Sequence, residues 1–183
     1  MNKKLTEQDY IEVAKSINCE VKTVKAVKQI ESSGNGFDEQ GRLLLRFEGH
    51  VFRGLTHKKY DKSNPNVSYP YYLMRQKKHG YEAFNEAFAL DKENAMLSCS
   101  FGLFQIMGFN HRLCGFDTVG EMVDYYKLGE YQQLSNFATF CKNRGLVDEL
   151  QTRNWAKFAF QYNGADYKAN NYDVKLKRAY ERA

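Results

Sequence analysis

Apolar residues recur every three or four positions through most of the 183-residue chain, and this spacing constrains the fold more than any other feature of the sequence. In the stretch 154–162 the apolar side chains lie at i, i+3, i+4 and i+7: Trp155, Phe158, Ala159 and Tyr162. The same period predicts helices over 6–17, 80–90, 118–128, 130–143 and from 172 to the C-terminus, and a helix capped by Asn18 that ends at Glu31. No repeat or linker divides the pattern, so we expect a single domain over residues 1–183.

One segment departs from the helical period. Residues 36–38 and 43–48, joined through 39–42, predict a small β-hairpin, and no other part of the chain has a comparable strand pattern. Gly34 precedes it and Gly36 begins it, and both glycines are expected to supply the positive φ that a helix end and a tight turn require. Residues 58–70 are polar and contain both prolines, which predicts a long surface loop. The predicted fold class is mainly α (α+β), with one small β-hairpin.

The composition excludes several classes of protein. Bulky side chains, including 13 Phe and 13 Tyr, exclude a mainly disordered chain. The longest apolar runs, such as 43–45, are far shorter than the ~20 residues of a spanning helix, so no stable membrane insertion is expected. Residues 5–9 are mostly polar where a signal peptide has its apolar core, and we expect the chain to start in the cytoplasm.

Cysteine and histidine spacing argues against a disulfide framework or a metal site. Cys19, Cys99, Cys114 and Cys141 are too far apart for C-x-x-C pairs, which predicts free thiols. His111 lies three residues before Cys114, but no further ligand pair has zinc spacing, so no metal or other cofactor is expected. The net charge of +5 favours an anionic partner: nucleic acid, anionic lipid or an anionic polymer.

Glu31 is the first candidate for chemistry. It lies four residues after Val27 and seven after Val24, on the stripe of its helix that should face the interior. Desolvation there would raise the pKa of the carboxyl toward neutrality, as a general acid requires. The alternative is that Glu31 is simply the exposed last turn of its helix.

Glu48 is a second candidate, because the second strand of the predicted hairpin ends in Phe-Glu-Gly-His at 47–50. Two carboxylates that flank a cleft are typical of glycoside cleavage, in which one protonates the leaving oxygen. The alternative for Glu48 is an ion pair with Arg42, Arg46 or Arg53.

Two further segments carry amide groups beside apolar side chains. The segment 98–110 places Gln105 and Asn110 where they can line a groove, and amides both donate to and accept from sugar hydroxyl and acetamido groups. Tyr162, Asn163 and Gly164 close the helix that begins near Asn154, with an aromatic ring and an amide at its end. Ordinary helix termination at a glycine is the alternative for this triplet.

Three motifs occur in order: Glu-Ser at 31–32, Gly-Leu-Phe-Gln-Ile-Met-Gly at 102–108 and Tyr-Asn-Gly at 162–164. Together they resemble the lysozyme superfamily, including its lytic transglycosylase and goose-type branches. More closely, the chain resembles the phage N-acetylmuramidase family of endolysins. The matching stretches are 27–37, 45–55, 93–114 and 155–164, so the resemblance spans nearly the whole chain and implies a lysozyme-like fold.

The resemblance implies a peptidoglycan hydrolase that cleaves the β-1,4 bond between N-acetylmuramic acid and N-acetylglucosamine, with Glu31 as catalytic acid and Glu48 as the second catalytic residue. The matching segments supply a candidate substrate-binding set: His50, Ser98, Ser100, Gln105, Asn110, Tyr162 and Asn163. Residues 98–102 read Ser-Cys-Ser-Phe-Gly where the family usually has Ser-Ala-Ser-Trp-Gly, so Phe101 keeps an aromatic wall but lacks the indole donor.

The resemblance also implies a monomer that acts on peptidoglycan glycan strands. No separate cell-wall-binding module is expected, and an endolysin of this kind would wait in the host cytoplasm until it is released to the cell wall or periplasm. A lytic transglycosylase, which forms 1,6-anhydro ends, carries the same motifs and stays open as an alternative. The alternative from another class is a non-catalytic basic helical binding protein. The basic residues of the chain are dispersed along the sequence, and this argues against nucleic acid as the partner.

Overall fold

The computed structural model describes residues 4–32 and 34–183, so residues 1–3 of the basic N-terminus and Ser33 of the predicted turn lie outside the described residues. The α-helices are α1 (Glu7–Ser16), α2 (Val21–Glu31), α3 (Gly49–Leu55), α4 (Tyr81–Leu90), α5 (Lys92–Leu97), α6 (Val119–Lys127), α7 (Glu130–Asn143), α8 (Val147–Thr152), α9 (Trp155–Asn163) and α10 (Tyr172–Arg182). Three 3₁₀ helices are η1 (Tyr71–Gln76), η2 (Gly108–Asn110) and η3 (Ala165–Lys168). The strands are β1 (Leu45–Phe47), β2 (Cys99–Phe101) and β3 (Ile106–Met107).

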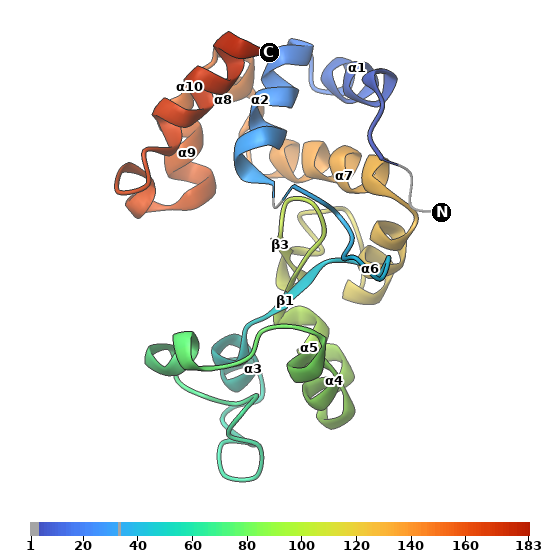
Figure 1. The fold of residues 1–183 in the computed structure, drawn as a ribbon, viewed down its shortest axis with the longest axis vertical. Coiled ribbons are helices and arrows are strands. Elements are labelled where there is room, and N and C mark those ends of the chain that lie inside the picture. Colours follow the sequence, from blue (N-terminus) through green and yellow to red (C-terminus); the bar gives the residue numbers. More distant parts are fainter. Residues whose placement is uncertain (1–3, 33) are drawn as a thin grey trace.

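The helices form two groups with the sheet between them. Figure 1 shows α1, α2 and α7 to α10 gathered at one end of the molecule, α3 to α5 at the other, and the strands with α6 in the middle. No helix in the described part of the chain combines the length and the apolar character that crossing a membrane requires. The helices and the small sheet between them confirm the predicted fold class, which is mainly α with a small β element.

The helices predicted from the period of apolar residues are present, and several begin at the side chains that favour a helix start. α1 has a capping box in which Thr6 accepts from the Asp9 N–H and Asp9 accepts from the Thr6 N–H. The prediction for Asn18 is wrong: the N-cap of α2 is Glu20, and Asn18 has a φ of 50° in the turn between the two helices. An Asn tolerates this left-handed conformation better than most residues, which explains its place there.

The predicted hairpin is wrong in its pairing. Residues 36–38 and 43–48 share one bridge, Phe37 to Leu43, and the Leu44 N–H donates to the Gly36 carbonyl at 2.9 Å. Asp38 closes the turn between them by accepting from the Gln40 and Arg42 N–H groups. β1 pairs instead with β2, antiparallel, and β2 pairs with β3 to give the order β1-β2-β3. β2 carries no alternating pattern, because all three of its residues are buried.

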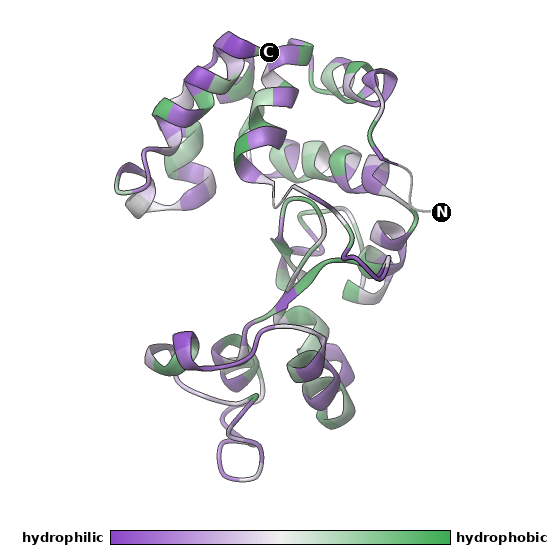
Figure 2. Cartoon of the chain, viewed as in Figure 1, coloured by the Kyte–Doolittle hydropathy of each residue, from purple (hydrophilic) through white to green (hydrophobic). Residues whose placement is uncertain are grey.

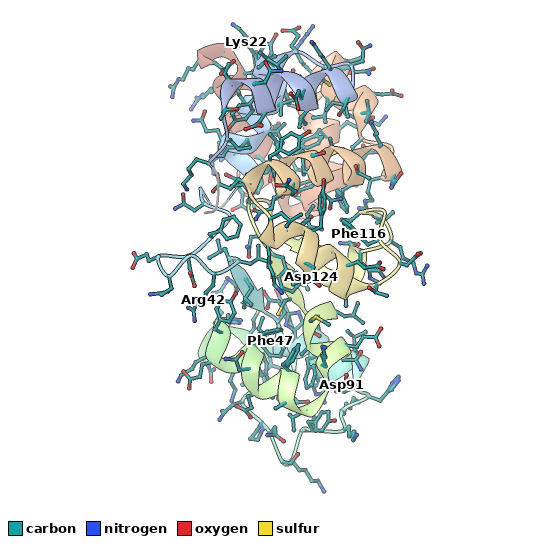
Figure 3. All side chains as sticks on the ribbon, turned by 90° about the vertical axis from the view of Figure 1, so that its right-hand side faces the viewer. Lys22, Arg42, Phe47, Asp91, Phe116 and Asp124 are labelled. Carbon is teal, nitrogen blue, oxygen red and sulfur yellow. The ribbon has the colours of Figure 1, made fainter. Side chains whose placement is uncertain are left out.

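The hydrophobic core runs through both groups of helices and the sheet. Its members include Val27 on α2, Phe47 on β1, Phe101 on β2, Leu134 on α7 and Phe158 on α9. In Figure 3, Phe47 lies between the sheet and α4, and it is fully buried. Figure 2 shows a hydrophilic tip on the loop that follows α3, as predicted for 58–70. The end of that loop is buried at residues 67–69, which anchors it to α3.

Gly49, the first residue of α3, provides the closest contact in this anchor. Its N–H donates to the hydroxyl of buried Tyr69 at 3.2 Å. A Cβ at this position would lie 2.2 Å from Tyr69 Cε1 and 2.7 Å from the Val67 carbonyl oxygen. Only glycine fits here, so the residue determines how closely the loop packs against α3.

We expect Gly49→Ala to lower the free energy of unfolding by about 1–3 kcal/mol, because the added methyl overpacks a buried contact. Gly54→Ala is the matched control, since Gly54 lies on the same helix and an added Cβ there has nothing within 4 Å. It should be neutral, or stabilising by up to ~1 kcal/mol through helix propensity. Urea denaturation of the two variants measures the difference, and equal effects would contradict the close contact.

Candidate active site

A groove of about 410 Å³ lies where α2, the segment 104–110 and α9 meet. The residues that line it are Glu31, Phe104, Gln105, Ile106, Met107, Asn110, Phe140, Tyr162, Asn163 and Tyr172. Five residues predicted from the sequence as site residues are therefore brought together here: Glu31, Gln105, Asn110, Tyr162 and Asn163. Among the described residues that line the groove, Glu31 is the one carboxylate.

Glu31 is the last residue of α2, and the helix stops there because Ser32 turns to extended backbone with a ψ of 151°. Gly34 follows with a φ of 92°, as predicted, whereas Gly36 does not have a positive φ. Burial raises the pKa of the Glu31 carboxyl from 4.5 to about 7, although a hydrogen bond from Asn163 lowers it. The desolvation expected from the helical period is thus present.

The partner of Glu31 comes from the end of α9. Asn163 Nδ2 donates to Glu31 Oε1 at 2.9 Å, and this bond favours the ionised form of the carboxyl. Gly164 ends α9 with a φ of 83°, and its N–H bonds to the Phe160 carbonyl. The glycine cap therefore leaves the Asn163 side chain directed at α2.

Tyr162 forms part of the apolar surroundings that desolvate Glu31. Its ring stacks on Phe158 at 5.5 Å between centroids and meets the edges of Phe137 and Phe140 at 5.7 and 6.1 Å. Burial and the nearby Glu31 charge raise the pKa of Tyr162 well above its ordinary value, so the phenol stays protonated. A neutral aromatic wall beside the acid follows from this packing.

Gln105 adopts a left-handed conformation with a φ of 48°, which is unusual for a residue other than glycine. Its Oε1 accepts from the Ser100 hydroxyl at 2.8 Å, and its Nε2 donates to the Gly102 carbonyl at 2.9 Å. Ser100 is buried and thus holds Gln105 in place rather than lining the groove. Ser98 is also buried, and its hydroxyl donates to the Asn94 carbonyl at 2.6 Å.

Glu48 and His50 lie in a different cluster at the start of α3, and neither lines the groove. Glu48 Oε1 accepts from Arg46 Nε at 2.7 Å, which is the ion pair considered as its alternative. Glu48 Oε2 lies 3.6 Å from His50 Nδ1 and 3.8 Å from His79 Nδ1. Burial lowers the pKa of His50, against the opposing charge of Glu48. The structure therefore separates the two carboxylates into two environments.

Two buried polar side chains on α7, absent from the sequence-based set, hold the backbone around the groove. Gln133 Oε1 accepts from the Leu103 N–H at 2.7 Å, and Gln133 Nε2 donates to the Tyr126 carbonyl at 3.0 Å. Glu130 Oε1 accepts from the Gly36 N–H at 3.0 Å and from Lys4 Nζ at 3.2 Å. These bonds fix the loop after Glu31 and the turn before Gln105.

Glycines make room for the Gln133 amide. A Cβ on Gly36 would lie 2.2 Å from Gln133 Oε1, and one on Gly102 would lie 2.7 Å from it. Polar residues at 130 and 133, in the same helical period as the apolar Leu134 and Phe137, are the sequence signal that could have indicated this role.

The described residues contain no group of three or more His, Cys, Asp or Glu side chains arranged to hold a metal ion. All four cysteines are free thiols, as predicted. The lining of the groove offers acid–base chemistry by one desolvated carboxyl, together with amide and aromatic contacts for a bound molecule.

Comparison with known proteins extends these observations. The sequence model of the Muramidase family, described as N-acetylmuramidase, matches residues 20–183. The chain is similar to the crystal structure of the Burkholderia AP3 phage endolysin, with a TM-score of 0.85 and 32% sequence identity. That similarity covers 97% of this chain and 70% of the endolysin chain. No match was found among curated proteins.

We expect Gln133→Met to lower the free energy of unfolding by about 2–4 kcal/mol, because it leaves the buried Leu103 N–H and Tyr126 carbonyl without their partner. Gln132→Met is the matched control, since Gln132 is the neighbouring glutamine on α7 and is only half-buried. Its effect should stay within ~0.5 kcal/mol. Chemical denaturation measures both, and a Gln133 variant as stable as the Gln132 variant would contradict the role assigned to these bonds.

Proposed function

The chain belongs to the N-acetylmuramidase family, and we propose that it cleaves the β-1,4 bond between N-acetylmuramic acid and N-acetylglucosamine in peptidoglycan, with Glu31 as the general acid. Family membership and the phage endolysin likeness support a peptidoglycan hydrolase, a glycoside hydrolase by its chemistry. The bond that is cleaved, the residue that acts as the general acid and the route of the reaction are parts of the proposal. The groove and its single carboxyl are its structural support.

The observation that carries the proposal is the burial of the Glu31 carboxyl in the groove. A glutamate with an ordinary pKa of 4.5 is almost entirely ionised at neutral pH, and an ionised carboxylate cannot donate a proton. Burial raises the Glu31 pKa to about 7, so that a large share of the molecules holds the proton at neutral pH. A pKa near the working pH is what efficient general acid catalysis requires.

In the proposed reaction Glu31 donates its proton to the glycosidic oxygen while the bond from that oxygen to C1 of muramic acid breaks. Positive charge then develops on C1 and the ring oxygen, beside the newly formed carboxylate. A water molecule adds to C1 through its oxygen and returns a proton to Glu31, which restores the acid. Asn163 holds the carboxyl in position through its bond to Oε1.

We propose a single-acid route, which is supported by the pairing of Glu48 with Arg46 and by the absence of Glu48 from the residues that line the groove. A second carboxylate at Glu48 stays a prediction. The same feature also suits a lytic transglycosylase, in which the C6 hydroxyl of muramic acid attacks C1 in place of water and leaves a 1,6-anhydro end. The sugar ends that are formed distinguish the two reactions.

We expect Glu31→Gln to lower the rate of peptidoglycan cleavage at least ~100-fold, because the amide cannot supply the proton. Purified peptidoglycan is digested, and the new ends are identified by mass spectrometry. Reducing muramic acid ends that disappear in the variant support the hydrolase, whereas anhydro ends assign the protein to the transglycosylases. Wild-type protein that is folded but cleaves nothing would contradict the enzyme and favour a binding protein.

Glu48→Gln is the companion variant in the same digestion. It keeps the size of the side chain and removes the charge that faces Arg46 and His50. The single-acid route predicts a rate within a few-fold of wild type. A loss as large as that of Glu31→Gln would instead require two carboxylates in the reaction.

The rate should fall as the pH rises through about 7, because the acid must be protonated and the Glu31 pKa is about 7. Asn163→Leu removes the hydrogen bond that lowers this pKa, so the fall in rate on the alkaline side of the pH profile should move to higher pH. Asn110→Leu is the control, since Asn110 lines the same groove but belongs to η2 rather than α9. Profiles of kcat/KM against pH measure both, and the proposal fails if this fall in rate moves equally in the two variants or in neither.

A further inference from the structure

The segment η1 presents two tyrosines to solvent. Tyr71 is 67% exposed and Tyr72 is 79% exposed, more than any other large hydrophobic side chain in the described chain. No residue of η1 is buried. Aromatic surface left in water is unfavourable, and adjacent exposed rings of this kind are characteristic of ligand-binding surfaces.

These rings are held in place by the backbone beneath them. Tyr69, two residues before Tyr71, is buried against Gly49, and Pro70 fixes the backbone at the start of η1. The ring nitrogens of His79 lie 2.9 Å from the carbonyl oxygens of Phe47 and Met74, which ties η1 to β1. A ligand that binds such a preorganised surface loses little freedom in ordering it.

Polar side chains lie on η1 and on the neighbouring elements β1 and α3. The His50 ring contacts the Tyr71 ring edge-on, with 5.0 Å between centroids and 80° between planes. The side chain of Arg46 is half exposed where it pairs with Glu48, and Arg75 on η1 is exposed. The surface thus combines aromatic faces with hydrogen-bond donors and positive charge.

The surface lies on the same side of the molecule as the groove. In Figure 1, η1 is the green helical turn to the left of α3, and α9, which contributes Tyr162 and Asn163 to the groove, lies above it on the same side. In this view the strands lie at a height between the two and to the right of both. A polymer that leaves the groove along this side therefore passes η1.

We propose that Tyr71 and Tyr72 form a saccharide-binding surface that contacts sugar rings of the glycan strand outside the groove. The apolar face of a pyranose ring stacks on a tyrosine, while its hydroxyl and acetamido groups bond to the polar side chains around it. The inference rests on the proposed function for the identity of the polymer. It adds a second contact that the cleavage step itself does not need.

Other occupants fit less well. A membrane surface requires a broad apolar face, whereas two rings with His50 in contact with Tyr71 and an exposed Arg75 on the same helical turn offer a small and partly polar one. A stable protein partner would bury about 800 Å² on this chain, far more than two tyrosine side chains supply. A sugar ring is similar in size to a tyrosine ring, and the positive charge of Arg75 complements an anionic strand.

The test measures binding without cleavage. In the Glu31→Gln background, Tyr71→Ala, Tyr72→Ala and the double variant are sedimented with purified insoluble peptidoglycan. We expect the double variant to bind about tenfold more weakly, the size of effect that one or two aromatic contacts produce. Tyr71→Trp with Tyr72→Trp should restore binding, because an indole offers the same apolar face. Leu128→Ala, at a side chain that is 65% exposed, is the control and should bind as the background does.

A second experiment measures the cleavage kinetics of the same tyrosine variants with Glu31 intact. The double variant should raise KM for intact peptidoglycan and leave kcat unchanged, with no effect on the shortest oligosaccharide that is cleaved. Unchanged sedimentation overturns the proposal, as does a loss of binding to anionic phospholipid vesicles with peptidoglycan binding intact. Failure of the proposed function would give a different result. Glu31→Gln would then still cleave peptidoglycan, and this would hold with or without the tyrosine substitutions.

Discussion

The hydrogen bonds of Gln133 connect parts of the chain that no strand pairing joins, and the shape of the groove depends on them. One buried amide binds the Leu103 N–H and the Tyr126 carbonyl, while Glu130 one turn earlier binds the Gly36 N–H. Each of these backbone groups is buried and needs a partner. α7 therefore acts as the support against which the turns beside the acid are positioned.

The side chains that meet beside α7 give the groove its chemistry. Glu31 stands at the end of one helix and Asn163 at the end of another, with the Tyr162 ring packed between Phe137, Phe140 and Phe158. The aromatic packing removes water from the carboxyl, and the amide limits how far its pKa rises. Two opposing effects on one group thus leave it able to donate a proton near neutral pH.

Sequence periodicity predicted the longer helices, because an amphipathic helix of nine residues or more repeats its apolar stripe. It missed α3, α5 and α8, which have seven residues or fewer and complete at most two turns. The pairing of β1 with β2 joins segments more than 50 residues apart, and no local pattern encodes it. Glu31 was visible as a carboxylate on an apolar stripe. Gln133 was not, because its partners are backbone atoms that meet it only in the folded chain.

The contact between Glu31 and Asn163 joins residues that are 132 positions apart in the chain. A ribosome that has synthesised α2 has therefore produced the acid long before it produces the helix that desolvates it. Until α9 has emerged and docked, Glu31 is an ordinary ionised glutamate in water. Synthesis through α9 is thus a condition for the hydrogen bond from Asn163 to Glu31, and a chain cut short before α9 contains the carboxyl but lacks the Asn163 amide and the Tyr162 ring beside it.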